Sequence, residues 1–349
     1  MQYGRILVRA TNWVGDAVMS VPALQQLRRS YPEAHIAILA MPSVAGLYGR
    51  ESFCDELIPY ELPRGARGFA EKWKLARELR ARNFDCALLL QNSFEAAVLV
   101  WLAGIPERIG YARDCRGIFL TRSVSVPKPG DIPTHQRFYY LEVLRRAHLL
   151  DNYTSNGDIR LGGKTAAAIE GRKRFGNASV KSPVIGISPG AAYGGAKRWL
   201  PERFAEAAIR VAEERAASIA VFGSPEELSI CETVRERIEA FGRPCVNFAG
   251  LTTLAQFIEL AAACDVFLAN DSGPMHIASA LGVPTVAIFG ATDDQATGPT
   301  GELSTVVRHP VDCSPCLLRE CPIDHRCMTR VSATIVADAA LSLMGTPKN

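Results

Sequence analysis

The sequence lacks any apolar run long enough to cross a bilayer. Its longest strongly apolar stretch, AAVLVWLAGI at residues 96–105, is about half as long as a transmembrane helix must be. The first residues, MQYGRILVRA, also lack the charged region, apolar region and cleavage site of a signal peptide. We therefore expect a cytoplasmic protein that meets a membrane at most at its surface.

The chain also carries little excess charge. Its 39 Lys and Arg residues against 36 Asp and Glu residues give a formal net charge of +3. A protein dedicated to nucleic acid usually concentrates more positive charge, so the composition argues against that partner. Hydrophobic residues make up 48% and charged residues 21%, a balance typical of a folded globular protein. At 349 residues the chain is too long for one ordinary core and fits two domains.

Three signatures of cofactor and metal binding are missing. The turn after the first predicted strand reads ATNWVGDA rather than GxGxxG, so a dinucleotide is not indicated. The later loop SPGAAYGGAKRWLP has no GKS or GKT, so a P-loop is not supported. No DxD-like pair stands where it could hold a divalent ion against a diphosphate, since Asp293 and Asp294 follow a different strand end. The sequence thus predicts neither a metal nor a cofactor.

Short apolar runs alternate with amphipathic segments through both halves of the chain, which predicts βαβ units and parallel sheets. A polar stretch at residues 151–182 separates the halves, and we place the boundary there, giving domains 1–165 and 166–349. The last predicted helix, residues 332–344, could also pack back on the first domain. The predicted fold is therefore α/β, with two Rossmann-like, doubly wound domains facing a cleft. The predicted strands are residues 5–10, 35–40, 56–61, 84–91, 184–188, 218–222, 245–248, 266–269 and 285–289.

Asp16 is the first candidate for chemistry, because it follows the first predicted strand at the start of a predicted helix, residues 16–30. One interpretation is an N-cap, in which the carboxylate accepts hydrogen bonds from free backbone N–H groups. The other is a general base at the edge of the sheet. Position alone favours the N-cap.

Lys197 is the second candidate, in the glycine-rich loop after residues 184–188. Backbone N–H groups in such a loop are open to an anion, and a lysine can neutralise phosphate. A solvated surface lysine is an equal alternative on composition alone.

The third candidate is the sequence NDSGPMHIASAL at residues 270–281. Asp271 and Ser272 end a strand, Gly273 turns, and the following helix carries His276. A helix start of this kind presents several N–H donors, which suits a diphosphate. The alternative is a capped turn with a histidine that faces the core.

Four cysteines form the pattern C-x2-C-x4-C-x5-C, with His325 inside it. Their number suits a tetrahedral zinc site, but the spacing is not a pair of C-x-x-C knuckles. Zinc, a redox-sensitive thiol cluster and simple packing therefore stay open, with packing favoured. The four are Cys313, Cys316, Cys321 and Cys327.

Four segments together resemble glycosyltransferase family 9, the family of the lipopolysaccharide heptosyltransferases. They occur in the family's order and span nearly the whole chain. The segments are RILVRATNWVGDAVMSVPALQQLRRSYP, ISPGAAYGGAKRWLP, NDSGPMHIASALGVPTVAIFGATDD and CSPCLLRECPIDHRCM. The resemblance implies a GT-B fold, with the acceptor bound mostly by the N-terminal domain and ADP-heptose bound by the C-terminal domain.

The resemblance also implies roles for particular residues. Asp16 matches the family's catalytic base, and Lys197 matches the lysine near the donor phosphates. Glu227 matches an acid that contacts the ribose, although Glu226 is adjacent. The donor-binding loop, which has serine where the related loop has threonine, corresponds to Asp271, Ser272, Gly273 and His276.

The implied function is inverting transfer of heptose from ADP-L-glycero-β-D-manno-heptose, a co-substrate, to the first heptose of the Kdo-lipid A core. Transfer to another core position is the nearest alternative. A sugar-nucleotide epimerase or hydrolase of GT-B architecture, with no lipid acceptor, is another. A non-catalytic module that binds nucleotide sugars is the third, and Asp16 argues against it.

The implied acceptor, heptosyl-Kdo-lipid A, is anionic and lies at the inner face of the inner membrane. Arginine suits its carboxylates and phosphates, because the guanidinium can donate two hydrogen bonds at once. The related enzymes place basic residues in the loop after the third strand. Solvated surface arginines are the alternative. The candidates in this chain are Arg64, Arg67, Arg113 and Arg116, with Arg122 nearby.

Overall fold

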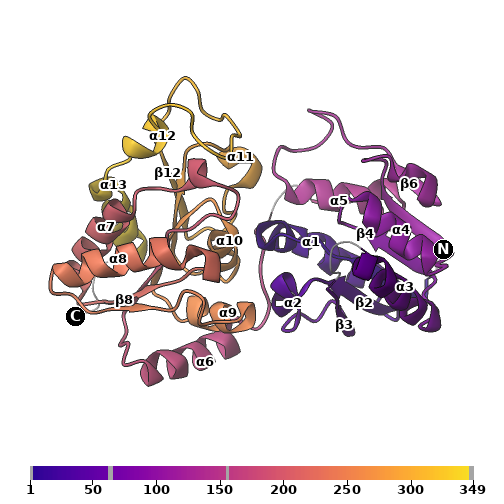
Figure 1. Cartoon of the computed structure of the whole chain (residues 1–349), viewed down its shortest axis with the longest axis horizontal. Coiled ribbons are helices and arrows are strands. Elements are labelled where there is room, and N and C mark those ends of the chain that lie inside the picture. Colours follow the sequence, from indigo (N-terminus) through magenta and orange to yellow (C-terminus); the bar gives the residue numbers. More distant parts are fainter. Residues whose placement is uncertain (1–2, 62–65, 155–156, 346–349) are drawn as a thin grey trace. The chain divides into compact units, whose positions relative to one another are not determined.

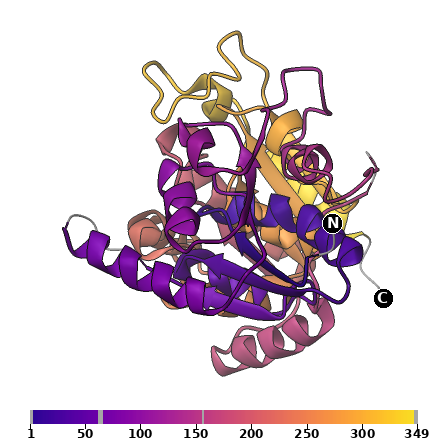
Figure 2. The same cartoon turned by 90° about the vertical axis from the view of Figure 1, so that its right-hand side faces the viewer.

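The computed structural model describes residues 3–61, 66–154 and 157–345, apart from the side chains of residues 66 and 67. The chain divides into two compact units, Met1–Gly157 and Asp158–Asn349. Each unit is built on one parallel sheet that helices cover on both faces (Figures 1 and 2). This confirms the predicted α/β class with two doubly wound units.

The first unit holds a six-stranded parallel sheet in the order β3-β2-β1-β4-β5-β6. The chain moves outward from β1 to β3 and then returns to β4 on the other side of β1. The carboxyl ends of β1 and β4 therefore flank a switch point, where open α/β sheets bind ligands. The strands are β1 (Arg5–Arg9), β2 (His35–Ala40), β3 (Glu56–Pro59), β4 (Cys86–Leu89), β5 (Glu107–Tyr111) and β6 (Arg122–Val124).

Right-handed crossovers place α1 and α2 on one face of this sheet and α3 and α4 on the other. Leu75 and Leu79 of α3 and Val100 of α4 pack on Leu39 and Leu89 of the strands. On the opposite face, α5 packs against α1. The helices are α1 (Val14–Ser30), α2 (Pro42–Tyr48), α3 (Ala66–Ala81), α4 (Phe94–Leu102), η1 (Arg116–Phe119) and α5 (Arg137–Arg146).

The second unit repeats this plan in the order β12-β11-β10-β7-β8-β9, so its switch point lies between β7 and β10. Its strands are β7 (Val184–Ser188), β8 (Ser218–Val221), β9 (Cys245–Asn247), β10 (Val266–Asn270), β11 (Thr285–Phe289) and β12 (Ser304–Arg308). Its helices are α6 (Lys164–Asn177), η2 (Gly195–Lys197), α7 (Pro201–Arg215), η3 (Pro225–Glu227), α8 (Leu228–Ala240), α9 (Leu254–Ala262), α10 (Gly273–Ala280), α11 (Asp294–Thr297), α12 (Arg326–Thr329) and α13 (Ala333–Met344).

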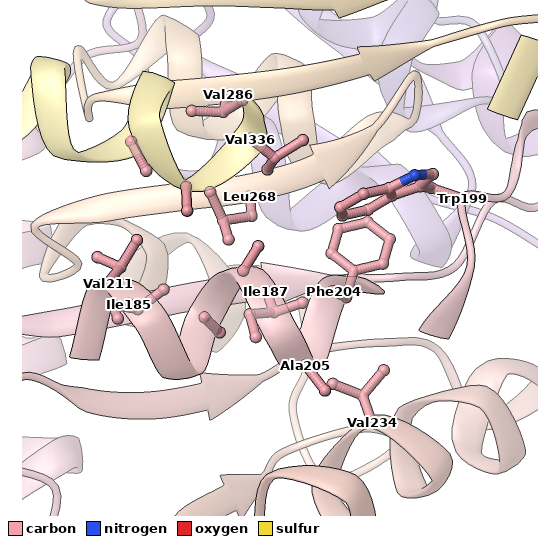
Figure 3. Close-up of a cluster of buried hydrophobic side chains, with 14 of the residues drawn as sticks. Ile185, Ile187, Trp199, Phe204, Ala205, Val211, Val234, Leu268, Val286 and Val336 are labelled. Carbon is pink, nitrogen blue, oxygen red and sulfur yellow. The ribbon is translucent and has the colours of Figure 1, made fainter. Parts of the chain in front are cut away.

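Figure 3 shows the core between the second sheet and helices α7 and α13. Leu268 of the sheet, Phe204 of α7 and Val336 of α13 are all buried there. Trp199 packs edge-on against Phe204, with ring centroids 4.9 Å apart, and its indole N–H donates to the Val331 carbonyl at 3.1 Å. The chain just after Lys197 is thus fixed in the core.

The boundary between the units lies after Gly157, not after residue 165 as the sequence predicted. The Ile159 N–H donates to Thr300 Oγ1 at 2.9 Å, and the Leu161 N–H donates to the Ala280 carbonyl at 3.0 Å. These bonds join the segment before α6 to the second unit. Polar composition marks the break in the sequence, but it does not show which side the following residues join.

All nine predicted strands are present, but the strands β5, β6 and β12 were not predicted. Each is a short strand at or near a sheet edge, where charged residues interrupt the apolar pattern. The last helix, α13, packs on α7 and on β10, β11 and β12 of the second unit. Within the described residues, no helix is long and apolar enough to cross a membrane.

Candidate functional site

Asp16 lies in the first turn of α1 at the carboxyl edge of the first sheet. The helix begins at Val14, and its N-cap is Trp13, which makes no side-chain capping bond. The interpretation of Asp16 as an N-cap is therefore wrong. Asp16 Oδ1 instead accepts a hydrogen bond of 2.9 Å from the hydroxyl of Tyr140, which stands on α5, 124 residues away.

Tyr140 acts as a fixed hydrogen-bond donor to this carboxylate. Burial raises the pKa of Tyr140 well above its ordinary value, and the neighbouring Asp16 charge raises it further. The phenol therefore keeps its proton at neutral pH. The start of a helix also carries partial positive charge, which favours a negative group at the position of Asp16. Nothing in the sequence pairs these two residues, so sequence reasoning missed Tyr140.

Lys197 is held in a buried ion pair at the carboxyl edge of the second sheet. Its Nζ lies 2.6 Å from Asp271 Oδ2, and the two side chains are only 12% and 3% exposed. The alternative of a solvated surface lysine is therefore wrong. Thr292 Oγ1 donates to the same carboxylate oxygen at 2.6 Å, and Thr297 Oγ1 lies 3.4 Å from it. Asp271 thus joins the loops that follow β7, β10 and β11.

The loop that carries Lys197 is closed at its base by Asn270. The Asn270 amide donates to the Pro189 carbonyl at 2.7 Å, and its Oδ1 accepts from the Trp199 N–H at 2.9 Å. Asn270 is completely buried. Since a buried amide without partners is costly, this pair of bonds fixes where the loop leaves and rejoins the core. The sequence motif contained Asn270, but only the structure shows what it does.

The outer part of the same loop is covered by residues 317–325. The Tyr193 hydroxyl donates to the Leu317 carbonyl at 2.7 Å, and the Ala196 N–H donates to the Arg319 carbonyl at 2.9 Å. A Cβ at Gly194 would lie 2.2 Å from that carbonyl oxygen, so the close approach requires glycine. Lys197 Nζ also lies 4.8 Å from the centre of the Tyr193 ring.

The remaining residues of the predicted donor loop lie beside Asp271. Ser272 is the N-cap of α10, and its hydroxyl donates to the Asn270 carbonyl at 3.2 Å rather than capping the helix. Gly273 is the first residue of α10. His276 is buried, as the alternative of a core-facing histidine expected, and its Nε2 lies 4.0 Å from Asp271 Oδ1.

Glu227 closes a capping box at η3, in which its Oε2 accepts from the Ser224 N–H at 2.9 Å. Its carboxylate also lies against the loop after β7, because a Cβ at Gly190 would meet it at 2.1 Å. Glu226 is exposed, and hydrogen bonds to its own backbone and to Ser224 lower its pKa. Of the two adjacent acids, Glu227 is the one that contacts the loop leading to Lys197.

The predicted acceptor arginines differ in their burial and in their hydrogen-bond partners. Arg116 is completely buried, and its guanidinium donates to the carbonyls of Tyr111 and Gln91 and to Asn92 Oδ1. Burial lowers its pKa to about 10. Arg116 therefore holds the loop after β5 together, and its prediction as an acceptor-binding residue was wrong.

Arg113 is exposed and lies 3.8 Å from Asp114 Oδ1, so it stays available to a solute. Arg64 and the side chain of Arg67 lie outside the described residues. Arg122 donates to the Ala147 carbonyl at 2.6 Å and lies 3.5 Å from Glu107, and so it stabilises the first unit.

The four clustered cysteines are free thiols, and among the described residues no group of His, Cys, Asp and Glu has the arrangement of a metal site. Burial raises the pKa of Cys327, and the nearby thiols of Cys313, Cys321 and Cys316 add to the shift.

The adjacent acids Asp293 and Asp294 both have partners within the second unit. Asp293 caps α11, and Asp294 forms an ion pair with Arg308.

Comparison with known proteins identifies the family to which this chain is similar. The model of glycosyltransferase family 9 (heptosyltransferase) matches residues 72–326. The chain is 32% identical over 313 residues to lipopolysaccharide heptosyltransferase 2 of Escherichia coli, covering 87% of this chain and 88% of that protein. It is 30% identical over 325 residues to lipooligosaccharide heptosyltransferase 2 of Haemophilus influenzae, with the same coverage.

A solved structure agrees with these relatives. The structure of E. coli ADP-heptose lps heptosyltransferase II has a TM-score of 0.81 and 29% identity, and the likeness covers 97% of this chain and 98% of that one. The expected GT-B fold is confirmed by this likeness. The chain belongs to glycosyltransferase family 9, the heptosyltransferases.

Proposed function

We propose that this enzyme transfers heptose from ADP-L-glycero-β-D-manno-heptose to the first heptose of the Kdo-lipid A core during lipopolysaccharide synthesis. One observation carries the proposal: over 87% of its length the chain is similar to relatives that are named lipopolysaccharide or lipooligosaccharide heptosyltransferase 2. The similar solved structure is likewise that of an ADP-heptose heptosyltransferase, which supports the choice of donor.

In this proposal the second unit binds the donor. Lys197 supplies the positive charge for the diphosphate, and Asp271 fixes the direction of the lysine through their contact of 2.6 Å. The N–H groups at the start of α10, beside Ser272 and Gly273, add donors for phosphate oxygens. Glu227 is the proposed partner of the ribose hydroxyls, because its carboxylate borders the same loop. His276 completes the set through its place beside Asp271.

Asp16 of the first unit is the proposed general base. It takes the proton of the acceptor hydroxyl while that oxygen forms a bond to the anomeric carbon of heptose. The bond from this carbon to the phosphate oxygen breaks, and ADP leaves with the electron pair. A single displacement of this kind inverts the anomeric centre. The Tyr140 hydroxyl keeps Asp16 in position and favours its charged form.

The acceptor is an anionic lipid, so the enzyme has to meet it peripherally at the inner face of the inner membrane. Exposed Arg113 remains a proposed contact for its carboxylates or phosphates. Arg64 and Arg67 remain proposed acceptor contacts by sequence. ADP-heptose is treated as a co-substrate, and the proposal needs no metal or other cofactor.

The test is a product assay with purified protein, ADP-heptose and heptosyl-Kdo-lipid A. We expect one added heptose by mass spectrometry, and ADP release that depends on the acceptor. ADP release at the same rate without acceptor would indicate a hydrolase or epimerase instead. Addition only to cores that already carry further sugars would indicate transfer at another core position.

A further inference from the structure

Five large apolar side chains lie exposed on neighbouring elements of the first unit. Two are tryptophans, two are phenylalanines, and the fifth is isoleucine. Folded proteins seldom leave a continuous apolar surface of this kind open to water unless it binds something. The exposed fractions are 62% for Phe69, 43% for Trp73, 48% for Phe94, 49% for Trp101 and 83% for Ile118.

These residues form one surface, because α3, α4 and η1 are fixed to each other. Lys72 of α3 pairs with Glu95 at the start of α4, at 2.6 Å. Arg80 of α3 donates to the Leu102 carbonyl at the end of α4, at 2.7 Å. The two helices therefore lie side by side along their length (Figures 1 and 2). We call the surface formed by the five exposed side chains of α3, α4 and η1 the aromatic face.

Ring contacts continue the aromatic face from α4 to η1. Phe119 packs edge-on against Phe94, with ring centroids 5.3 Å apart, and against Trp101, at 5.4 Å. Phe69 and Trp73 make a similar edge-on contact on α3, at 6.3 Å. Each exposed ring is thus held in place by contact with another ring of the same unit, without a bound molecule.

Positive charge lies along the same stripe of α3. Phe69, Trp73 and Arg77 are spaced four residues apart and so lie on one side of the helix. Arg77 is exposed. Lys74 is also exposed, but it lies three residues after Glu71 and four residues before Glu78, so it shares the side of the helix that carries these acids. Aromatic rings beside lysine and arginine are typical of segments that lie on the surface of an anionic bilayer.

We propose that the aromatic face is the surface through which this enzyme docks on an anionic lipid bilayer. Trp73, Trp101 and Phe69 enter the interface between headgroups and acyl chains, while Arg77 contacts lipid phosphates. This inference rests on the proposed function, since a lipid-borne acceptor requires contact with a membrane. The first turns of α3 and α4 begin at the carboxyl edge of the sheet, the edge at which Asp16 lies.

A bilayer fits the aromatic face better than a second copy of the chain. A two-fold contact through the same face would bring Arg77 of one copy near Arg77 of the other, and like charges in contact are unfavourable. A bilayer with anionic headgroups instead attracts Arg77 while it receives the rings.

The first experiment measures flotation of the full chain with vesicles of phosphatidylethanolamine and phosphatidylglycerol, in a ratio of about three to one. Phosphatidylcholine vesicles serve as the uncharged comparison. The variant Arg77→Glu should weaken binding to the anionic vesicles by roughly fivefold or more, and the loss should shrink as salt rises. The double variant Trp73→Ser/Trp101→Ser should weaken binding by about tenfold or more at any salt concentration.

Matched control variants come from the second unit. Phe241→Ser removes a ring that is 71% exposed, and Arg172→Glu reverses an exposed charge on α6. Both should bind vesicles as the wild type does. Thermal melting checks that all variants fold. Equal binding by the wild type and the two face variants would overturn the proposal. The proposal would also be overturned if the wild type did not bind vesicles and the face variants lost a self-association that the wild type shows.

A second readout locates the rings directly. The chain has four tryptophans, and two of them lie on the aromatic face. Vesicles with brominated acyl chains should quench the emission of the wild type, and the Trp73→Phe/Trp101→Phe variant should lose most of this quenching. Undiminished quenching in that variant would place the lipid elsewhere.

The proposed function and the docking surface can fail separately. On a soluble, deacylated core acceptor, the face variants should turn over at the wild-type rate, whereas on vesicle-bound acceptor their rate should fall about tenfold. If no transfer occurs on either acceptor, the vesicle assays still decide the docking surface. If transfer occurs and face variants match the wild type on vesicles, only the docking surface is wrong.

Discussion

The two units hold their charged groups in different ways. In the second unit, Asp271 is buried and Lys197 is nearly so. Thr292, Asn270 and the segment at residues 317–325 fix them and their loop. In the first unit, Asp16 is half-buried, and its Oδ1 accepts a hydrogen bond from the Tyr140 hydroxyl. A group that only has to attract charge can be fixed before substrate arrives. A base has to stay open to the proton that it removes.

The largest expected effect tests Asp16, the proposed base of the first unit. Asp16→Asn keeps the shape but cannot accept a proton, so kcat should fall by roughly 10²-fold or more. ADP affinity, measured by calorimetry, should stay within about twofold, because Asp16 belongs to the other unit. Near wild-type turnover in Asp16→Asn would remove Asp16 as the base.

A second substitution tests the ion pair of the second unit. Lys197→Met should weaken ADP binding by about 1.5–3 kcal/mol, a factor of roughly 10 to 150, because a charge-assisted contact with phosphate is lost. Asp271→Asn should weaken binding less, since it disturbs the lysine without removing it. The double variant should lose less than the sum, because the residues act as one pair.

The substitutions at Lys197 and Asp271 leave a buried charge without its partner, so stability has to be followed as well. The readout is calorimetry at a temperature well below the melting point of each variant. Unchanged ADP affinity and unchanged donor KM in folded Lys197→Met would show that the donor assignment is wrong.

Tyr140→Phe tests how the hydrogen bond from Tyr140 affects the proposed base, Asp16. The Tyr140 hydroxyl donates to the Asp16 carboxylate and so favours its deprotonated form. Loss of this bond should lower kcat roughly tenfold and move the acid limb of the pH profile of kcat/KM to higher pH. The pH profile separates this effect from a simple loss of packing, which would lower the rate without moving the limb. An unmoved acid limb would exclude this role for Tyr140.

The sequence predicted elements whose own residues determine them. Residues 184–188 were predicted as a strand and form β7, because a short unbroken run of small and apolar residues suits a strand that is buried on both faces. The first turn of α1 was missed, because Trp13 and Val14 give no capping pattern, and so the N-cap interpretation of Asp16 was wrong. Periodicity finds the body of a helix better than its end.

Residues that depend on distant partners could not be predicted in this way. Arg116 stands in a sequence that resembles a loop, yet the fold buries its guanidinium among carbonyl groups. Lys197 is equally consistent with a surface position until its pairing with Asp271, 74 residues away, is known. Family resemblance raised the weight of Lys197 and Asp16, whereas Arg116 was chosen as an acceptor contact for its loop-like sequence, which does not report burial.

Substitutions of Arg113 and Arg116 should have smaller effects, and they test whether burial separates an acceptor contact from a structural arginine. Arg113→Ala should raise the acceptor KM by between about 1.5-fold and fivefold, as for an exposed ion pair, with less effect at high salt. Arg64→Ala and Arg67→Ala should act in the same direction. Arg116→Ala should instead lower the melting temperature, because it leaves buried carbonyls without a donor. A raised acceptor KM with an unchanged melting temperature in Arg116→Ala would reverse its reassignment.

The smallest expected effect is that of a chelator. A divalent ion at the diphosphate would need carboxylates whose oxygens can turn toward it. Asp293 caps α11, Asp294 pairs with Arg308, and Asp271 already accepts hydrogen bonds from Lys197 and Thr292. Lys197 and the N–H groups of α10 are placed to meet the phosphate charge themselves. Transfer rates in EDTA should therefore match those in magnesium. A rate that falls in EDTA and returns with magnesium or manganese would show that these residues do not carry the diphosphate charge alone.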